Sequence, residues 1–325
     1  MMEKQNKIVA GLTLIALIAL VTAYFAPIWW VSLTAPNYPE DAFPDGIRIH
    51  FHFDGVYNGC KAAGAGSQMA DEIIQGDLDD TMERWNPILD AQHVEKDVKG
   101  LDCVHEMNTI NHYVGMFPIA TGAPVEKPLS KFFMGFFAVM MVAFALPKKK
   151  ARLAALVAGF AAVAVWMIVD QFVMGRLDSH VQNYVAEAGT FFKEPERIQA
   201  WGDNVKLISQ IVIFGLIAIM GVVVAGVAKL RSFQLLLAGV PALLPAFFLV
   251  TYSAWLWFFG HNLHPWGAFT VKPFMPTVFG EGKVAQFSTY SYPYWGFALL
   301  MVMFICLGLA LLIRRKQLRE DPAAE

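Results

Sequence analysis

The side chains best suited to chemistry in this chain are soft metal ligands in one polar stretch. His50 and His52 stand two residues apart, and Cys103, His105 and Met107 repeat that spacing. On a β-strand, residues two apart project from the same face. Imidazole, thiolate and thioether groups together suit copper better than magnesium or calcium. The pattern therefore indicates a copper site in this stretch.

A second polar cluster follows, in the string NTINHYVGM from Asn108 to Met116. If residues 111–116 are helical, His112 and Met116 lie four residues apart on one face. Solvated histidine pairs and a polar turn that fastens this region to a membrane are the alternatives without chemistry. The predicted copper ligands are His50, His52, His105, His112 and Met116, with Asn108, Asn111 and Tyr113 supporting them as second-shell or structural residues.

Two further groups of residues leave their role open. Cys60 and Cys103 are either a disulfide or a pair of thiolate ligands, whereas Cys306 falls in an apolar run and is expected to pack there. His261 and His264 belong to a later polar loop rich in aromatic residues. They are either structural or contributors to the same site, and the aromatics around them are typical of a membrane interface.

The elements that must position these residues are mostly membrane helices. The mean hydropathy is +0.46, with 56% hydrophobic and 16% charged residues, which excludes an ordinary soluble enzyme. We predict an all-α polytopic membrane protein with six transmembrane helices. The predicted spans are residues 8–31, 132–147, 153–174, 207–228, 232–259 and 293–313.

The cations predict the orientation of these spans. Lys and Arg residues precede the first span, fill two short connections at 148–152 and 229–231, and follow the last span. By the positive-inside rule these sites are cytoplasmic, with both termini, in the inner membrane. The long segments 32–131, 175–206 and 260–292 are then periplasmic. A cleavable signal ending near Ala23 is the alternative for the first span.

The predicted organisation has three parts. Residues 1–31 form an N-terminal anchor, and residues 32–131 form a small α+β extracytoplasmic domain inserted after the first helix. Residues 132–325 form a five-helix bundle with its two external loops. Within the domain, residues 46–54 alternate as a half-buried strand, and a second strand is expected near Leu101–Met107.

The chain lacks the sequence motifs of several classes of protein, among them haem proteins. All eight histidines fall between the predicted spans, so no intramembrane histidine can hold a haem, and no C-x-x-C-H string occurs. No haem is therefore expected. The basic residues are explained by membrane topology, and no nucleic-acid partner is predicted. The expected partners are the lipid bilayer and a periplasmic protein. No catalytic residue stands out, and a role other than that of an enzyme is favoured.

The chain resembles the membrane proteins encoded beside nitrous oxide reductases of the Sec-exported type (clade II). The resemblance is carried by Tyr38-Pro39 ahead of Gly46-Ile47, by the string from Glu106 to Met116 with its NHYVGM core, and by the string from Phe259 to Pro265. Pro273, Pro276 and Gly280 match the loop that follows. Two departures stand out: His264 occupies a position where the family pattern has Asp, and residues 60–103 look like an insertion.

The resemblance implies an accessory membrane protein for a copper enzyme, acting on the periplasmic face. Copper handling, maturation or electron supply for a nitrous oxide reductase is the expected role. One alternative is a redox membrane subunit that takes electrons from quinol and passes them to a periplasmic partner. A permease or scaffold is the second alternative.

Overall fold

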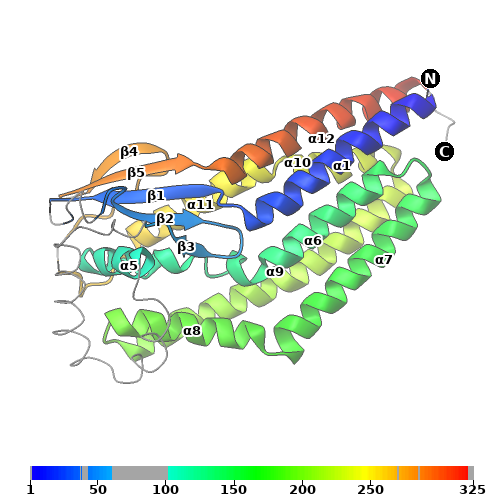
Figure 1. Cartoon of the computed structure of the whole chain (residues 1–325). Coiled ribbons are helices and arrows are strands. Elements are labelled where there is room, and N and C mark those ends of the chain that lie inside the picture. Colours follow the sequence, from blue (N-terminus) through cyan, green and yellow to red (C-terminus); the bar gives the residue numbers. More distant parts are fainter. Residues whose placement is uncertain are drawn as a thin grey trace, which may run out of the picture.

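The structure, a computed structural model, describes residues 2–36, 38, 43–60, 102–268, 271–284 and 286–320. It is mostly helical, with a five-stranded antiparallel sheet at one end (Figure 1). In the described residues, five helices are long and apolar enough to cross a membrane, and a bent helix pair makes a sixth candidate if it counts as one span. These candidate spans agree with the membrane character that the hydropathy predicts.

The bundle consists of α1 (Met2–Phe25), α6 (Glu126–Ala145), α7 (Lys149–Ile168), α9 (Pro195–Lys229), the pair α10 (Leu236–Ala242) and α11 (Leu244–His261), and α12 (Trp295–Glu320). Helices α1 and α12 run side by side, with their outer ends far from the sheet (Figure 1). At that far end, Arg314 donates to the Asn6 side chain at 3.0 Å and to the Phe144 carbonyl at 3.3 Å. These bonds join three helices where the predicted cytoplasmic cations gather.

Several predicted span boundaries differ from the observed helices, among them the end of α1 and the start of α6. Helix α1 ends at Phe25, two residues before Pro27, and residues 29–31 of the predicted anchor belong to a strand instead. Helix α6 begins at Glu126, six residues before the predicted start. Pro128 is compatible with that start, because a proline in the first turn removes an N–H that has no partner within the helix.

The predicted span 232–259 is broken. A 3₁₀ turn at Arg231–Leu235 leads into α10, and the axis bends by 52° before α11. Pro241 lies inside α10 and Pro245 in the first turn of α11. A proline ring inside a helix clashes with the carbonyl four residues earlier, so the chain cannot continue as one straight helix.

The segment expected as the external loop 175–206 is largely helical. Helix α7 continues into a short π-helix at Val169–Val173, and α8 spans Arg176–Phe191 after Gly175, whose φ is +67°. Helix α9 then begins at Pro195, twelve residues before its predicted span. It therefore reaches beyond the apolar bundle to the sheet end, which we define as the end of the molecule that carries the sheet.

The sheet draws its strands from two distant parts of the chain. Strands β1 (Trp29–Thr34), β2 (Ile47–Phe51) and β3 (Val56–Asn58) follow α1, while β4 (Gly280–Val284) and β5 (Phe287–Pro293) precede α12. The strand order is β3-β2-β1-β5-β4. The predicted α+β region is thus not a simple insertion after the first helix, because two of its strands come from the predicted loop 260–292.

The two faces of the sheet differ in character. Trp30 pairs with His50 and Tyr292, so these three side chains share the outer face with Arg48. Leu33, Ile47 and Ile49 occupy the inner face and pack in a buried cluster against Cys103, Met107 and Ile110. The predicted alternation of residues 47–51 is confirmed by this register.

The second strand predicted near Leu101–Met107 is wrong. Residues Cys103–Tyr113 form helix α5, and the Asp102 carboxylate caps it by accepting from the amides of Val104 and His105 at 3.1 and 3.2 Å. On a helix, Cys103 and Met107 share a face and His105 lies on the opposite one. Of the three residues whose spacing suggested a strand, only Cys103 and Met107 therefore lie on one stripe of the helix.

Candidate functional site

The sheet separates the predicted copper ligands. His50 lies on the outer face, where its ring stacks on Tyr294 with ring centres 5.1 Å apart. Beside it, the Arg48 guanidinium lies 4.2 Å from the ring centre of Trp30. Burial, with the positive charge of Arg48 as a smaller cause, lowers the pKa of His50 to about 4. His50 is therefore neutral at pH 7 in an aromatic, cationic setting.

His52 follows the end of β2 and turns toward the bundle. Its ring meets Tyr57 edge-on, with centres 4.6 Å apart, and it contributes to the wall of a cavity described below. Burial lowers its pKa, and the Asp54 carboxylate partly opposes that effect.

His105 and His112 lie on the face of α5 turned away from the sheet. Their rings lie 6.0 and 5.6 Å from the ring centre of Phe191 at the end of α8. Since the inner face of the sheet packs on the opposite side of α5, His50 cannot share one site with these two histidines. No group of three or more His, Cys, Asp or Glu side chains placed to hold a metal occurs within the described ranges.

Cys60 and Cys103 form a disulfide, with Cα atoms 6.1 Å apart. Of the two alternatives left open by the sequence, the structure therefore has the disulfide. In that state neither sulfur is a thiolate, the form that binds metals. The bond ties the chain just after β3 to the first residue of α5. The residues between, 61–101, fall outside the described residues.

Met116 is not on the same helical face as His112, because α5 ends at Tyr113. Gly115 adopts φ +82°, and the amide of Met116 returns to the Asn111 carbonyl at 2.9 Å. The Met116 side chain is 3% exposed and packs in a cluster with Phe117, Phe192 and Phe259. The prediction that the two side chains share a helical face is therefore wrong, and the thioether has a packing role.

The turn after α5 meets the loop after α11, so the two strings that carry the family resemblance are in contact. The amide of His264 donates to the Gly115 carbonyl at 2.7 Å. A Cβ atom at Gly115 would lie 2.5 Å from the His264 carbonyl oxygen, and one at Gly267 would lie 2.8 Å from the Gly115 nitrogen. The backbones approach so closely that both positions require glycine. We call this contact the paired turn.

His264 is locked at the centre of the paired turn. Its Nδ1 accepts from the Trp266 amide at 3.1 Å, and its Nε2 lies 3.1 Å from the Glu194 carboxylate. Because an amide N–H can only donate, the ring proton must sit on Nε2 and be donated to Glu194. Phe192 stacks on the ring at 4.3 Å between centres. Burial lowers the pKa of His264, with Glu194 opposing it.

The supporting residues have structural partners. Asn108 is 1% exposed; its amide donates to Glu187 at 2.9 Å and its carbonyl accepts from the Ala120 amide at 2.9 Å. It thereby connects α5, α8 and the segment that leads into α6. His261 stacks on Trp257 and bonds the carbonyl of that residue at 2.8 Å, while Tyr113 is 47% exposed.

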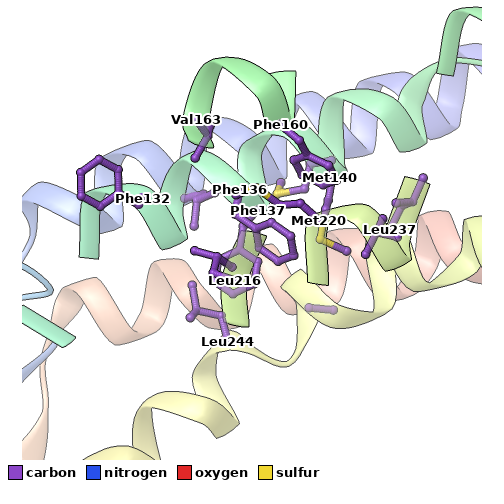
Figure 2. Packing of buried hydrophobic residues seen from close by; sticks show 14 of the residues in the cluster. Phe132, Phe136, Phe137, Met140, Phe160, Val163, Leu216, Met220, Leu237 and Leu244 are labelled. Carbon is purple, nitrogen blue, oxygen red and sulfur yellow. The ribbon is translucent and has the colours of Figure 1, made fainter. Parts of the chain in front are cut away.

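A cavity of about 560 Å³, which the sequence did not reveal, lies where the bundle meets the sheet end. Its body is apolar and is formed by α6, α9 and the bent pair α10–α11. Figure 2 shows Phe137, Leu216 and Leu244, three of its lining residues, lying together. At the sheet end the lining becomes polar, with Glu126, Lys127 and His52. The volume falls within the range of small-molecule pockets.

Comparison with known proteins adds no assignment: no family description, no curated protein and no solved structure matches the chain.

Proposed function

We propose that this protein is a non-catalytic accessory membrane protein that serves a nitrous oxide reductase at its sheet end. In this proposal the sheet end is periplasmic and both termini are cytoplasmic. The observation that carries it is the paired turn. Two strings far apart in the sequence, each of which resembles the proteins encoded beside these reductases, pack against each other where His264 meets Gly115.

The paired turn has the properties of a preformed docking element. It combines an internally bonded histidine, close-packed glycines and a buried aromatic cluster around Met116 and Phe192. Exposed aromatic groups stand beside it, including Tyr113 at 47% and Trp266 at 52%. Aromatic side chains at the centre of a rigid surface commonly anchor protein partners.

The geometry favours maturation or electron supply over storage of copper by this chain. A single copper site built from the predicted ligands would need groups from opposite sides of the sheet, together with a buried thioether and disulfide-bonded cysteines. The donor set therefore does not fit the metal. In this proposal the copper belongs to the partner enzyme.

The proposal is tested in cells that lack this protein and are complemented with variants. An aspartate can accept the Trp266 amide as His264 Nδ1 does, so we expect His264→Asp to restore nitrous oxide reduction. His264→Leu cannot accept that bond and should restore less than about a tenth of it. Wild-type reduction in the uncomplemented strain would overturn the proposal.

The same strain separates the two roles. If the reductase isolated from it lacks copper, the protein acts in maturation. If that reductase holds its copper and works with reduced viologen as donor, yet fails in cells, the protein acts in electron supply. Both outcomes support an accessory function, and each excludes the other role.

A second candidate function is that of a quinol-interacting membrane subunit, and the cavity is the observation that favours it. Quinols reside in the bilayer, and a site for them must open to lipid and offer a polar group to the head. The permease alternative has no comparable observation in its favour.

A further inference from the structure

We propose that the cavity between α6, α9 and the bent pair α10–α11 binds a quinol, with the head group at Glu126 and the isoprenoid tail in the apolar body. This deepens the second candidate function and does not depend on the nitrous oxide reductase proposal. Binding is the whole of the proposal, and no electron transfer by this chain is included.

The mouth of the cavity opens sideways among lipid-facing side chains. Ile219 and Val222 on α9 are 51% and 61% exposed, and Phe247 on α11 is 43% exposed, yet all three line the cavity. Leu236 on α10, which is 44% exposed, completes this rim. A ligand that enters here must arrive through the hydrocarbon region, because these segments belong to candidate membrane spans.

The body of the cavity matches an apolar chain in chemistry. Phe136, Phe137 and Met140 from α6 line one side, and Leu216 and Val223 from α9 line another. Figure 2 shows Phe137 of α6 close to Leu216 of α9. When a branched hydrocarbon tail enters the cavity, the tail and the cavity wall both exchange contact with lipid for contact with each other. That exchange is nearly neutral in a membrane, so the polar end must decide which molecule binds.

The polar end offers a carboxylate that is already held in place. Trp255 Nε1 donates to Glu126 Oε2 at 2.9 Å, across the bundle from α11 to α6. A carboxylate has about four acceptor sites, so Glu126 can accept a further hydroxyl. The neighbouring Lys127 ammonium donates to the Thr121 carbonyl at 2.8 Å, which engages one of its three donors.

This end also favours a small neutral head group over a phospholipid. Gly55 and Gly122 close the cavity toward the sheet, where a Cβ atom added at either glycine would lie 3.4 or 3.5 Å from the Lys127 side chain. A phosphate drawn into this end would meet the Glu126 carboxylate and lose its hydration. A quinol instead presents hydroxyl donors to that carboxylate and a flat ring to Trp255 and Tyr252.

The experiment uses the full-length protein in liposomes and an azido-quinone photoprobe, with labelled peptides mapped by mass spectrometry. We expect saturable labelling on α6 and α11 near Glu126 and Trp255. An excess of menaquinol should remove it, and the same excess of phosphatidylethanolamine should not. Labelling that is unsaturable, or that phospholipid removes equally well, would overturn the proposal and indicate an ordinary lipid site.

Three variants locate the site. Val223→Trp adds volume in the body of the cavity, and Ile219→Trp adds volume at the mouth, where Ile219 is 51% exposed. Each should lower labelling at least about fivefold. Val165→Trp is the matched control, because Val165 is 63% exposed on α7 and does not line the cavity. If Val223→Trp fails to fold, Ile219→Trp alone tests whether the probe binds in this cavity. Labelling of Ile219→Trp at the wild-type level would show that it binds elsewhere.

Glu126→Gln tests the head-group contact. Replacing the carboxyl group with an amide should weaken competition by menaquinol about tenfold, while thermal stability stays near that of the wild type. Unchanged competition would show that the carboxylate does not hold the head. These results are independent of whether cells lacking the protein reduce nitrous oxide.

Discussion

At the residue scale, most of the histidines that the structure describes lie against aromatic rings. His50 stacks on Tyr294, His264 on Phe192 and His261 on Trp257. Residue type and spacing suggested that these histidines bind one metal. The sequence does not reveal that α5 covers the face of the sheet opposite His50, which separates the predicted ligands. His264 stands where the resemblance proposed from the sequence predicts Asp, and its Nδ1 accepts the amide two residues on, as an Asp carboxylate does in an Asx turn.

His50 predicts a pH dependence of stability. Its pKa falls to about 4 in the folded protein because of burial and Arg48, against 6.5 when unfolded. Between these values only the unfolded chain binds the proton, so stability falls as the pH drops from 6.5 to about 4. Thermal unfolding at about pH 7.5 and about pH 5, on either side of the unfolded pKa, should show a larger loss for the wild type than for His50→Gln. Equal losses would contradict the assignment.

The copper content of the purified protein tests whether the predicted ligands, which lie on opposite sides of the sheet, bind copper together. Because His50 and His112 lie on opposite sides of the sheet and α5 layer, we expect the purified protein to hold well below one copper per chain. His112→Ala and His50→Ala/His52→Ala should leave that content unchanged. A full equivalent of copper that either variant abolishes would show that the predicted ligands do act together.

At the element scale, length and hydropathy predicted the long helices of the bundle. The local pattern failed where the same residues fit both the two-residue repeat of a strand and the 3.6-residue repeat of a helix. Cys103 and Met107 fit both a strand and a helical stripe, and only the Asp102 cap with Ile110 and Val114 favours the helix. Strand β5 escaped prediction because its buried face carries hydroxyls, with Thr289 at 8% and Ser291 at 0% exposure. Trp29 donates to Ser291 at 2.8 Å, so that face is polar yet satisfied.

Gly115 predicts a large cost for a small substitution. Gly115→Ala forces a side chain into φ +82° and against the His264 carbonyl, so we expect a loss of about 2–4 kcal/mol in unfolding free energy. Gly280→Ala is the matched control, because its φ is +88° with no heavy atom within 4 Å of the added carbon. Thermal unfolding that ranks the two variants equally would contradict the close contact of the paired turn.

The disulfide predicts a further loss. Cys60→Ser should destabilise the sheet end by about 3–4 kcal/mol, since the bond closes a loop with a sequence separation of 43 residues. Cys306→Ala, which removes the free cysteine of α12, should change little. Limited proteolysis with and without reductant measures the difference. Equal resistance under both conditions would argue against a stabilising bond.

At the scale of the whole molecule, the sheet end and the cation-rich end lie at opposite ends of the bundle (Figure 1). This arrangement agrees with the topology that the cations predict. In a chain whose Cys306 is replaced by alanine, Glu281→Cys, on exposed β4, should react with an impermeant maleimide in intact cells. Lys316→Cys, at the end of α12, should react only after the cells are permeabilised. The reverse pattern would invert the proposed orientation.

The division of the sheet between β1–β3 and β4–β5 has a consequence for biogenesis. Strand β1 is synthesised before most of the membrane helices, but its partner β5 emerges only after all of the described ones except α12. Until then β1 presents an unpaired edge, the kind of surface that pairs with other chains. Completion of the sheet is therefore one of the last steps of assembly. A chain truncated before residue 287 would carry all of the described membrane helices except α12, but its sheet could not close.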